Sequence, residues 1–176
     1  MTVIIINGHG GSGKDTFVEY FTDIAGENYT LNISTVDYIK KVARDLGWNG
    51  QKDNLSRKFL SDLKDIATYW GDIPYWDVYH KTNNFFKELQ EFGVDKNGFV
   101  FIHCREPQEI KRLIDAFRIR YNAYALLIRR PTNENYGNHA DDEVENYEYD
   151  YIINNDTNLD DLSHKAKEFY NILKQK

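Results

Sequence analysis

The sequence GHGGSGKDT at positions 8–16 contains the residue types that bind phosphate. Its glycines let the backbone fold into a cradle whose N–H groups point inward at an anion. Lys14 follows the last glycine and supplies a mobile cation for the β- and γ-phosphates of a nucleotide. This spacing, G-x-x-x-x-G-K, therefore predicts a phosphate-binding loop made of Gly8, Gly10, Gly11, Ser12, Gly13, Lys14, Asp15 and Thr16.

The residues after the lysine depart from the usual loop. A Ser or Thr normally comes directly after the lysine and binds Mg²⁺ through its hydroxyl group. In this chain Asp15 has that position and the hydroxyl comes one residue later, at Thr16. We therefore expect ATP and Mg²⁺ as cofactors, with Thr16 approaching the metal or the α-phosphate and Asp15 as a second candidate ligand.

Hydrophobic periodicity indicates which elements position this loop. Residues 2–7 form a continuous apolar run, typical of a parallel strand covered on both faces, and residues 14–25 are expected to form a helix. Further strands are predicted at 29–34, 98–104, 123–128 and 149–154, separated by amphipathic helices. This alternation predicts one α/β domain over residues 1–176, a three-layer α/β/α sandwich around a parallel sheet.

Two segments interrupt the alternation and are candidate lids over a substrate. Residues 36–92 contain about three helices between two strands, and residues 130–146 form a polar, mostly acidic connection. The middle helix is marked by apolar residues at helical spacing: Leu55, Phe59, Leu63, Ile66, Ala67 and Trp70. We expect Trp70, Tyr75 and Trp76 to pack in the core, with stacking on an acceptor base as the alternative.

Composition excludes several classes of protein. The chain has 22 basic and 28 acidic residues, a net charge of −6, which offers no basic field for a long nucleic acid. No stretch is apolar for long enough to span a membrane, and the N-terminal apolar run is expected to be a strand and not a secretory signal. Cys104 is the only cysteine, so no internal disulfide is expected and the cytoplasm is the expected compartment.

The GKDT form of the loop resembles the P-loop nucleoside monophosphate kinases, in particular the deoxynucleoside monophosphate kinase group. FIHCREPQEI (101–110) is similar to a strand and Arg-x-Pro-x-Glu segment of that group, and YDYIINNDTNLDDL (149–162) to its last strand, base loop and closing helix. The resemblance implies ATP-dependent phosphoryl transfer to a (deoxy)nucleoside monophosphate. Nucleotides would then be the partners, and a homodimer is a possible assembly.

Arginines at two predicted strand ends are candidate catalytic residues together with Lys14. Arg105 follows a central strand at the edge where open α/β sheets bind ligands, so we expect it to contact a phosphate or the acceptor. Its alternative is an ion pair with Glu106 or Glu109. The resemblance implies that Arg129 or Arg130 contacts the phosphate donor, the alternative being two solvated arginines.

The same resemblance makes residues 36–92 an acceptor-binding insert, with Asp37, Lys41 and Arg57 as candidate contacts. A helix N-cap would explain Asp37 without function, and an exposed helix cation would explain Arg57.

One residue departs from the kinase pattern. His103 stands where the related kinases have an acid that helps hold Mg²⁺, so Glu106 or Asp15 would have to replace that acid. This departure motivates one further hypothesis, a nucleotide-binding regulatory module with little turnover. Independently of it, a P-loop kinase acting on another phosphorylated metabolite remains an alternative.

Overall fold

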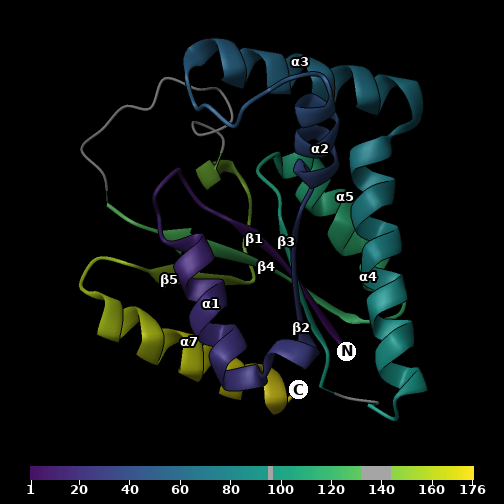
Figure 1. Cartoon of the computed structure of the whole chain (residues 1–176). Coiled ribbons are helices and arrows are strands. Elements are labelled where there is room, and N and C mark those ends of the chain that lie inside the picture. Colours follow the sequence, from purple (N-terminus) through teal and green to yellow (C-terminus); the bar gives the residue numbers. More distant parts are fainter. Residues whose placement is uncertain (95–96, 132–143) are drawn as a thin grey trace.

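Strand β1 (Thr2–Asn7) lies at the centre of a five-stranded parallel sheet, as its continuous apolar run predicts. In the computed structural model, which describes residues 1–94, 97–131 and 144–176, the strand order is β2-β3-β1-β4-β5 (Figure 1). The other strands are β2 (Thr30–Ser34), β3 (Phe99–His103), β4 (Asn122–Arg129) and β5 (Tyr151–Asn154). All five predicted strands are present, and each differs from its predicted bounds by at most two residues.

Six α-helices are described: α1 (Lys14–Ala25), α2 (Asp37–Asp45), α3 (Asn54–Gly71), α4 (Ile73–Glu91), α5 (Pro107–Phe117) and α7 (Leu159–Lys174). Short 3₁₀ turns occur at η1 (Glu27–Tyr29) and η2 (Val144–Asn146). Of these described helices, none is long and apolar enough to cross a membrane.

The alternating side chains of β1 divide the core into the two apolar layers of a sandwich. Val3 and Ile5 pack in a cluster with residues of α4 and α5, while Ile4 and Ile6 pack in a second cluster with residues of α1 and α7. Figure 1 shows these two pairs of helices on opposite faces of the sheet. The predicted three-layer α/β/α architecture is therefore confirmed.

Phe21 of α1 is the centre of the second cluster. Its ring contacts Phe99 and Phe101 edge-on, with centroids 5.1 and 4.9 Å away, and lies 6.1 Å from the ring of Phe169 in α7. Aromatic pairs prefer such tilted and edge-to-face arrangements because ring faces are negative and ring edges positive. The contacts fix α1, and with it the loop that precedes α1, against the sheet.

The segment 36–92 consists of α2, α3 and α4, as expected, but these helices differ in burial. Helix α4 belongs to the sheet layer, with Val78 and Phe86 in the core. Helix α3 has no buried residue, although the apolar spacing of its sequence predicts a core-facing side. Trp70 is 82% exposed, Trp76 45% and Tyr75 only 8%, so the prediction of core packing is correct for Tyr75 and wrong for Trp70 and Trp76.

We predict that replacing Phe21 with Ala lowers the free energy of unfolding by about 3–5 kcal/mol. The change leaves a cavity among four aromatic rings, those of Phe99, Phe101, Phe169 and Tyr170. The matched control is Phe92→Ala, since Phe92 is 84% exposed at the end of α4 and should change stability by no more than ~0.5 kcal/mol. Urea unfolding followed by circular dichroism measures both. Equal losses in the two variants would contradict the assigned core.

Candidate functional site

The segment between β1 and α1 forms a tight turn at the carboxyl edge of the sheet. Ser12 N–H donates to the carbonyl of His9 at 3.1 Å, and Phe17 N–H donates to that of Gly13 at 2.9 Å, which begins α1. The first N–H groups of a helix have no partner within the helix and carry partial positive charge. The turn therefore places an anion-binding helix end beside the predicted phosphate-binding loop.

Two glycines of the loop lie too close to other segments to carry a side chain. A Cβ atom on Gly8, where φ is 149°, would lie 2.4 Å from the carbonyl oxygen of Ile128 in β4. A Cβ atom on Gly13, where φ is 92°, would lie 2.5 Å from Nδ2 of Asn155. The loop is thus fitted against β4 at one end and against the residue after β5 at the other.

Lys14 folds back over the loop. Its Nζ donates to the carbonyl of Gly8 at 2.5 Å and to that of His9 at 2.8 Å, and lies 3.5 Å from Oγ of Ser12. The ammonium group is therefore held at the loop itself and not among the core side chains, as a phosphate-binding role requires. A negative charge bound in the loop would meet both this cation and the N-terminus of α1.

A pocket of about 260 Å³ opens beside the loop. Its walls are residues 11–16 of the loop together with Arg130, Asn155, Leu159 and Leu162. Of the two candidate arginines, the structure thus brings Arg130 to the loop. Arg129 instead forms an ion pair with Glu145 in η2, donating from Nε to Oε1 at 2.9 Å and from its terminal nitrogen to Oε2.

A partly buried hydrogen-bond network that the sequence did not suggest orients the start of the loop. Asn7 Oδ1 accepts from Gly8 N–H at 2.7 Å, and Asn7 Nδ2 donates to the hydroxyl of Tyr149 at 2.7 Å. That hydroxyl in turn donates to the carbonyl of Val144 at 2.8 Å. Burial raises the pKa of Tyr149 to about 12, so the hydroxyl keeps its proton at neutral pH and can donate. The network joins the loop to η2, which follows the undescribed residues 132–143.

At the far end of the loop, Asn155 Nδ2 donates to the carbonyl of Ser12 at 2.9 Å. Asn155 is buried, and so is Ser12. The only sequence signal for Asn155 and Tyr149 was that both lie in the segment 149–162 that resembles the kinase group; their contacts with the loop span more than 140 positions, beyond the range of any local pattern.

His103 lies at the carboxyl end of β3, beside the loop. Its Nε2 lies 2.9 Å from Oδ1 of Asn32 and 3.8 Å from the carboxylate of Asp15. Burial lowers the pKa of His103, partly offset by the charge of Asp15. The imidazole is therefore neutral at pH 7, and its Nε2 is best placed as a donor to Asn32. It does not supply the negative charge of the acid that it replaces.

Of the two carboxylates expected to replace that acid, Glu106 already has a partner. It forms an ion pair with Lys64 of α3. Burial opposes the charge on Glu106, but the field of Lys64 and their hydrogen bond outweigh it and lower the Glu106 pKa. The side chain of Asp15 is 86% exposed in front of the loop.

A Mg²⁺ ion in a phosphoryl-transfer site typically binds one or two carboxylates and otherwise substrate phosphates and water. Asp15 and Thr16 fit that requirement. Within the described ranges no three His, Cys, Asp or Glu side chains are grouped closely enough to form a metal site of protein ligands alone.

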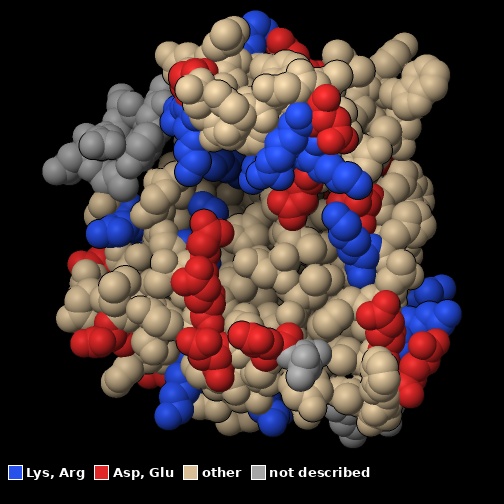
Figure 2. All heavy atoms as spheres, viewed as in Figure 1, with Lys and Arg blue, Asp and Glu red and all other residues tan. Residues whose placement is uncertain are grey.

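The candidate acceptor residues lie on the helices above the carboxyl edge of the sheet. Asp37 Oδ2 accepts from Ser34 N–H at 2.7 Å, so it has a structural role at the start of α2. Lys41 is exposed on α2, and Arg57 is exposed in the first turn of α3. Figure 2 shows a hollow below these helices with Lys and Arg side chains gathered along its upper edge. Arg105 is exposed two residues after the end of β3, and its carbonyl accepts from Asn7 Nδ2 at 3.2 Å.

Known structures share this architecture over nearly the whole chain. The APS kinase of Mycobacterium tuberculosis, solved in complex with AMPPNP and APS, is 12% identical with a TM-score of 0.50, covering 98% of this chain and 97% of its own. A candidate kinase from Chloroflexus aurantiacus is 9% identical with a TM-score of 0.52, covering 95% and 97%. No protein-family description matches the sequence. No curated protein matches it either. The chain has the α/β fold of nucleotide kinases with a phosphate-binding loop.

We predict that Gly8→Ala lowers the free energy of unfolding by about 1–3 kcal/mol, because its Cβ atom meets a strand carbonyl and its φ is unfavourable for alanine. Gly10→Ala is the matched control in the same loop: no heavy atom lies within 4 Å of its Cβ position, so stability should change by at most ~0.5 kcal/mol. Thermal unfolding measures both. If Gly10→Ala were the more damaging change, the loop geometry described above would be wrong.

Proposed function

We propose that this chain transfers the γ-phosphoryl group of ATP to a (deoxy)nucleoside monophosphate. The observation that carries the proposal is the position of Lys14, which is held across the phosphate-binding loop at the N-terminus of α1. A loop that only connected a strand to a helix would not require glycines at these two close contacts together with a cation folded over them.

The chemistry of such a site is mainly positioning and charge neutralisation. The loop N–H groups and the Lys14 ammonium bind the β- and γ-phosphates, and Arg130 approaches from the other wall of the pocket. Arg105, exposed after β3, is the candidate contact on the acceptor side. Asp15 and Thr16 would hold Mg²⁺, which when bound neutralises phosphate charge. A phosphate acceptor is already an anionic nucleophile near neutral pH, so the protein needs no dedicated general base.

The acceptor is assigned to the hollow between the sheet edge and α2–α3. The basic side chains along its rim suit a phosphorylated ligand (Figure 2). Arg57 of α3 and Lys41 of α2 are the candidate contacts with the acceptor. Asp37, at the start of α2, is a third candidate. The undescribed residues 132–143 belong to the second proposed lid, 130–146.

A second acceptor class is motivated by the solved APS kinase, which has the same fold and binds APS together with AMPPNP. Under this alternative the chain remains a P-loop kinase but phosphorylates another small phosphorylated metabolite. A third alternative, a nucleotide-binding regulatory module, is motivated by the neutral His103 in place of an acid.

The deciding experiment measures ADP release with ATP and a panel of nucleoside and deoxynucleoside monophosphates, with APS as a separate arm. We expect turnover with at least one monophosphate, and Lys14→Met should reduce it on the order of 100-fold or more. Lys87→Met, an exposed substitution on α4, is the matched control and should keep the parent rate. Turnover with APS alone would select the second alternative, and ATP binding without turnover would select the third.

We also predict which carboxylate replaces the missing acid. Asp15→Asn should raise the Mg²⁺ concentration needed for half-maximal activity several-fold, because it removes the exposed carboxylate in front of the loop. Glu106→Gln should leave that concentration nearly unchanged, because Lys64 already neutralises Glu106. Magnesium titrations of the initial rate test both variants. The reverse pattern would assign the metal to Glu106.

A further inference from the structure

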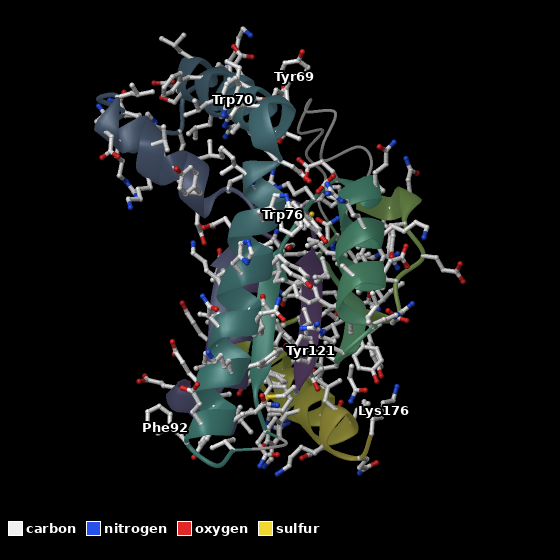
Figure 3. All side chains as sticks on the ribbon, turned by 90° about the vertical axis from the view of Figure 1, so that its right-hand side faces the viewer. Tyr69, Trp70, Trp76, Phe92, Tyr121 and Lys176 are labelled. Atoms are coloured by element: carbon white, nitrogen blue, oxygen red, sulfur yellow. The ribbon has the colours of Figure 1, made fainter. Side chains whose placement is uncertain are left out.

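Helix α3 exposes a stripe of large apolar side chains that nothing described in the chain covers. Leu55, Ile66 and Trp70 are all exposed, as is the neighbouring Tyr69 at 94%. Figure 3 shows Tyr69 and Trp70 at the outer end of α3, pointing away from the sheet and its helices. With Phe59, which is partly exposed, the residues 55, 59, 66 and 70 fall within an arc of about 60° on one side of the helix.

The stripe is too large to be an ordinary feature of a monomer surface. A single aromatic side chain buries roughly 150–250 Å² when covered, and the stripe ends in two of them. Contiguous exposed apolar patches beyond a few hundred Å² mark sites of interaction. The other flank of α3 packs on α2 and α4, and Lys64 on that flank reaches Glu106 at the sheet edge. The stripe is therefore separate from the proposed acceptor site.

The spacing of the stripe is the same in both directions along the helix. The intervals between residues 55, 59, 66 and 70 are 4, 7 and 4. If a second α3 lies antiparallel, Leu55 comes opposite Trp70 of the partner subunit, and Phe59 opposite Ile66 of the partner subunit. A two-fold axis between residues 62 and 63 produces all four contacts at once. Such self-complementarity is what an isologous interface requires.

Charges beside the stripe favour the antiparallel orientation. Lys58 lies in the first half of α3 and Asp65 in the second half, on the same flank, and both are exposed. In the antiparallel register the partner's Asp65 comes level with position 60, two residues or about 3 Å along the axis from Lys58, so a long lysine side chain can reach it, and the two-fold axis repeats the pair. A parallel pair would place like charges together. Asp62 lies nearest the two-fold axis, where its charge is partly neutralised by its own Lys58 at 2.8 Å.

We propose that the chain forms a homodimer in which two α3 helices pack antiparallel through the stripe of Leu55, Phe59, Ile66, Tyr69 and Trp70. The pairing leaves the phosphate-binding loop of each copy accessible, because the stripe faces away from the sheet. The pairing would also hold α3, the outer helix of the segment 36–92, against α3 of the other copy. The inference is independent of whether the chain is a kinase.

Sedimentation velocity across a micromolar concentration series tests the dimer. We expect the parent chain to dimerise, and Trp70→Glu and Ile66→Glu each to weaken dimerisation by roughly 30-fold or more, as for buried interface anchors. Phe92→Glu is the matched control, because Phe92 is as exposed as Trp70 but lies at the opposite end of α4 (Figure 3). A parent chain that stays monomeric throughout, or a loss of dimer only in Phe92→Glu, would overturn the proposal.

The orientation has its own test. Lys58→Asp should weaken the dimer about tenfold by opposing the partner's Asp65, and the double variant Lys58→Asp/Asp65→Lys should recover most of the loss. A cysteine at position 62, near the two-fold axis, should cross-link efficiently between copies with a short bismaleimide, while one at position 55 should not. The native Cys104 is buried and is the background control. Efficient cross-linking at 55 together with no rescue by the charge exchange would show a parallel pair and overturn the proposed interface.

Discussion

The fold depends on a close approach between the loop after β1 and the neighbouring strand β4. A Cβ atom on Gly8 would lie only 2.4 Å from the carbonyl oxygen of Ile128. The chain can leave β1 in this direction only because Gly8 has no Cβ atom. The turn thus starts the loop directly against β4, which pairs with β1 along the whole length of β1. The aromatic cluster around Phe21 then fixes the helix whose N-terminus the loop presents.

Charge in the proposed site is divided between two sides of the sheet edge. Lys14, Arg130 and the end of α1 provide the positive potential on the loop side, while Lys64 of α3 is committed to Glu106. His103 adds no charge between them because burial lowers its pKa and keeps the imidazole neutral. Asp15 is thus an exposed carboxylate of the loop itself. In the proposed reaction it is the candidate carboxylate ligand of Mg²⁺.

Local patterns in the sequence were sufficient to predict the strands, most of the helices and the position of the glycine-rich loop. The β-branched run of β1 and the amphipathic spacing of α1, α5 and α7 each correspond to an observed element. They were insufficient where a contact joins distant segments, as for Asn7 with Tyr149 and Ser12 with Asn155. Local patterns also did not show which of Arg129 and Arg130 lines the pocket. Neighbouring residues at a strand end point to opposite sides, and only the tertiary structure shows which side bears the pocket. Helix α3 shows another limit: helical periodicity identifies an apolar side but not whether that side faces its own core.

The absence of buried residues in α3 has a consequence for how stability is distributed in the chain. Strands β1, β3 and β4 and helix α1 share fully buried side chains and should open only with the whole molecule. In a single copy, helix α3 is held by partly buried contacts and the Lys64–Glu106 pair and can unfold locally at far lower cost. Substitutions on α3 should therefore change the free energy of unfolding of a single copy only slightly. In the proposed dimer, contacts through the stripe of α3 would oppose this local unfolding. The surface of α3 outside the proposed dimer stripe is therefore the part of the segment 36–92 in which the sequence can diverge most readily. Under the proposed function, a new acceptor preference can arise there while the buried core and the loop stay intact.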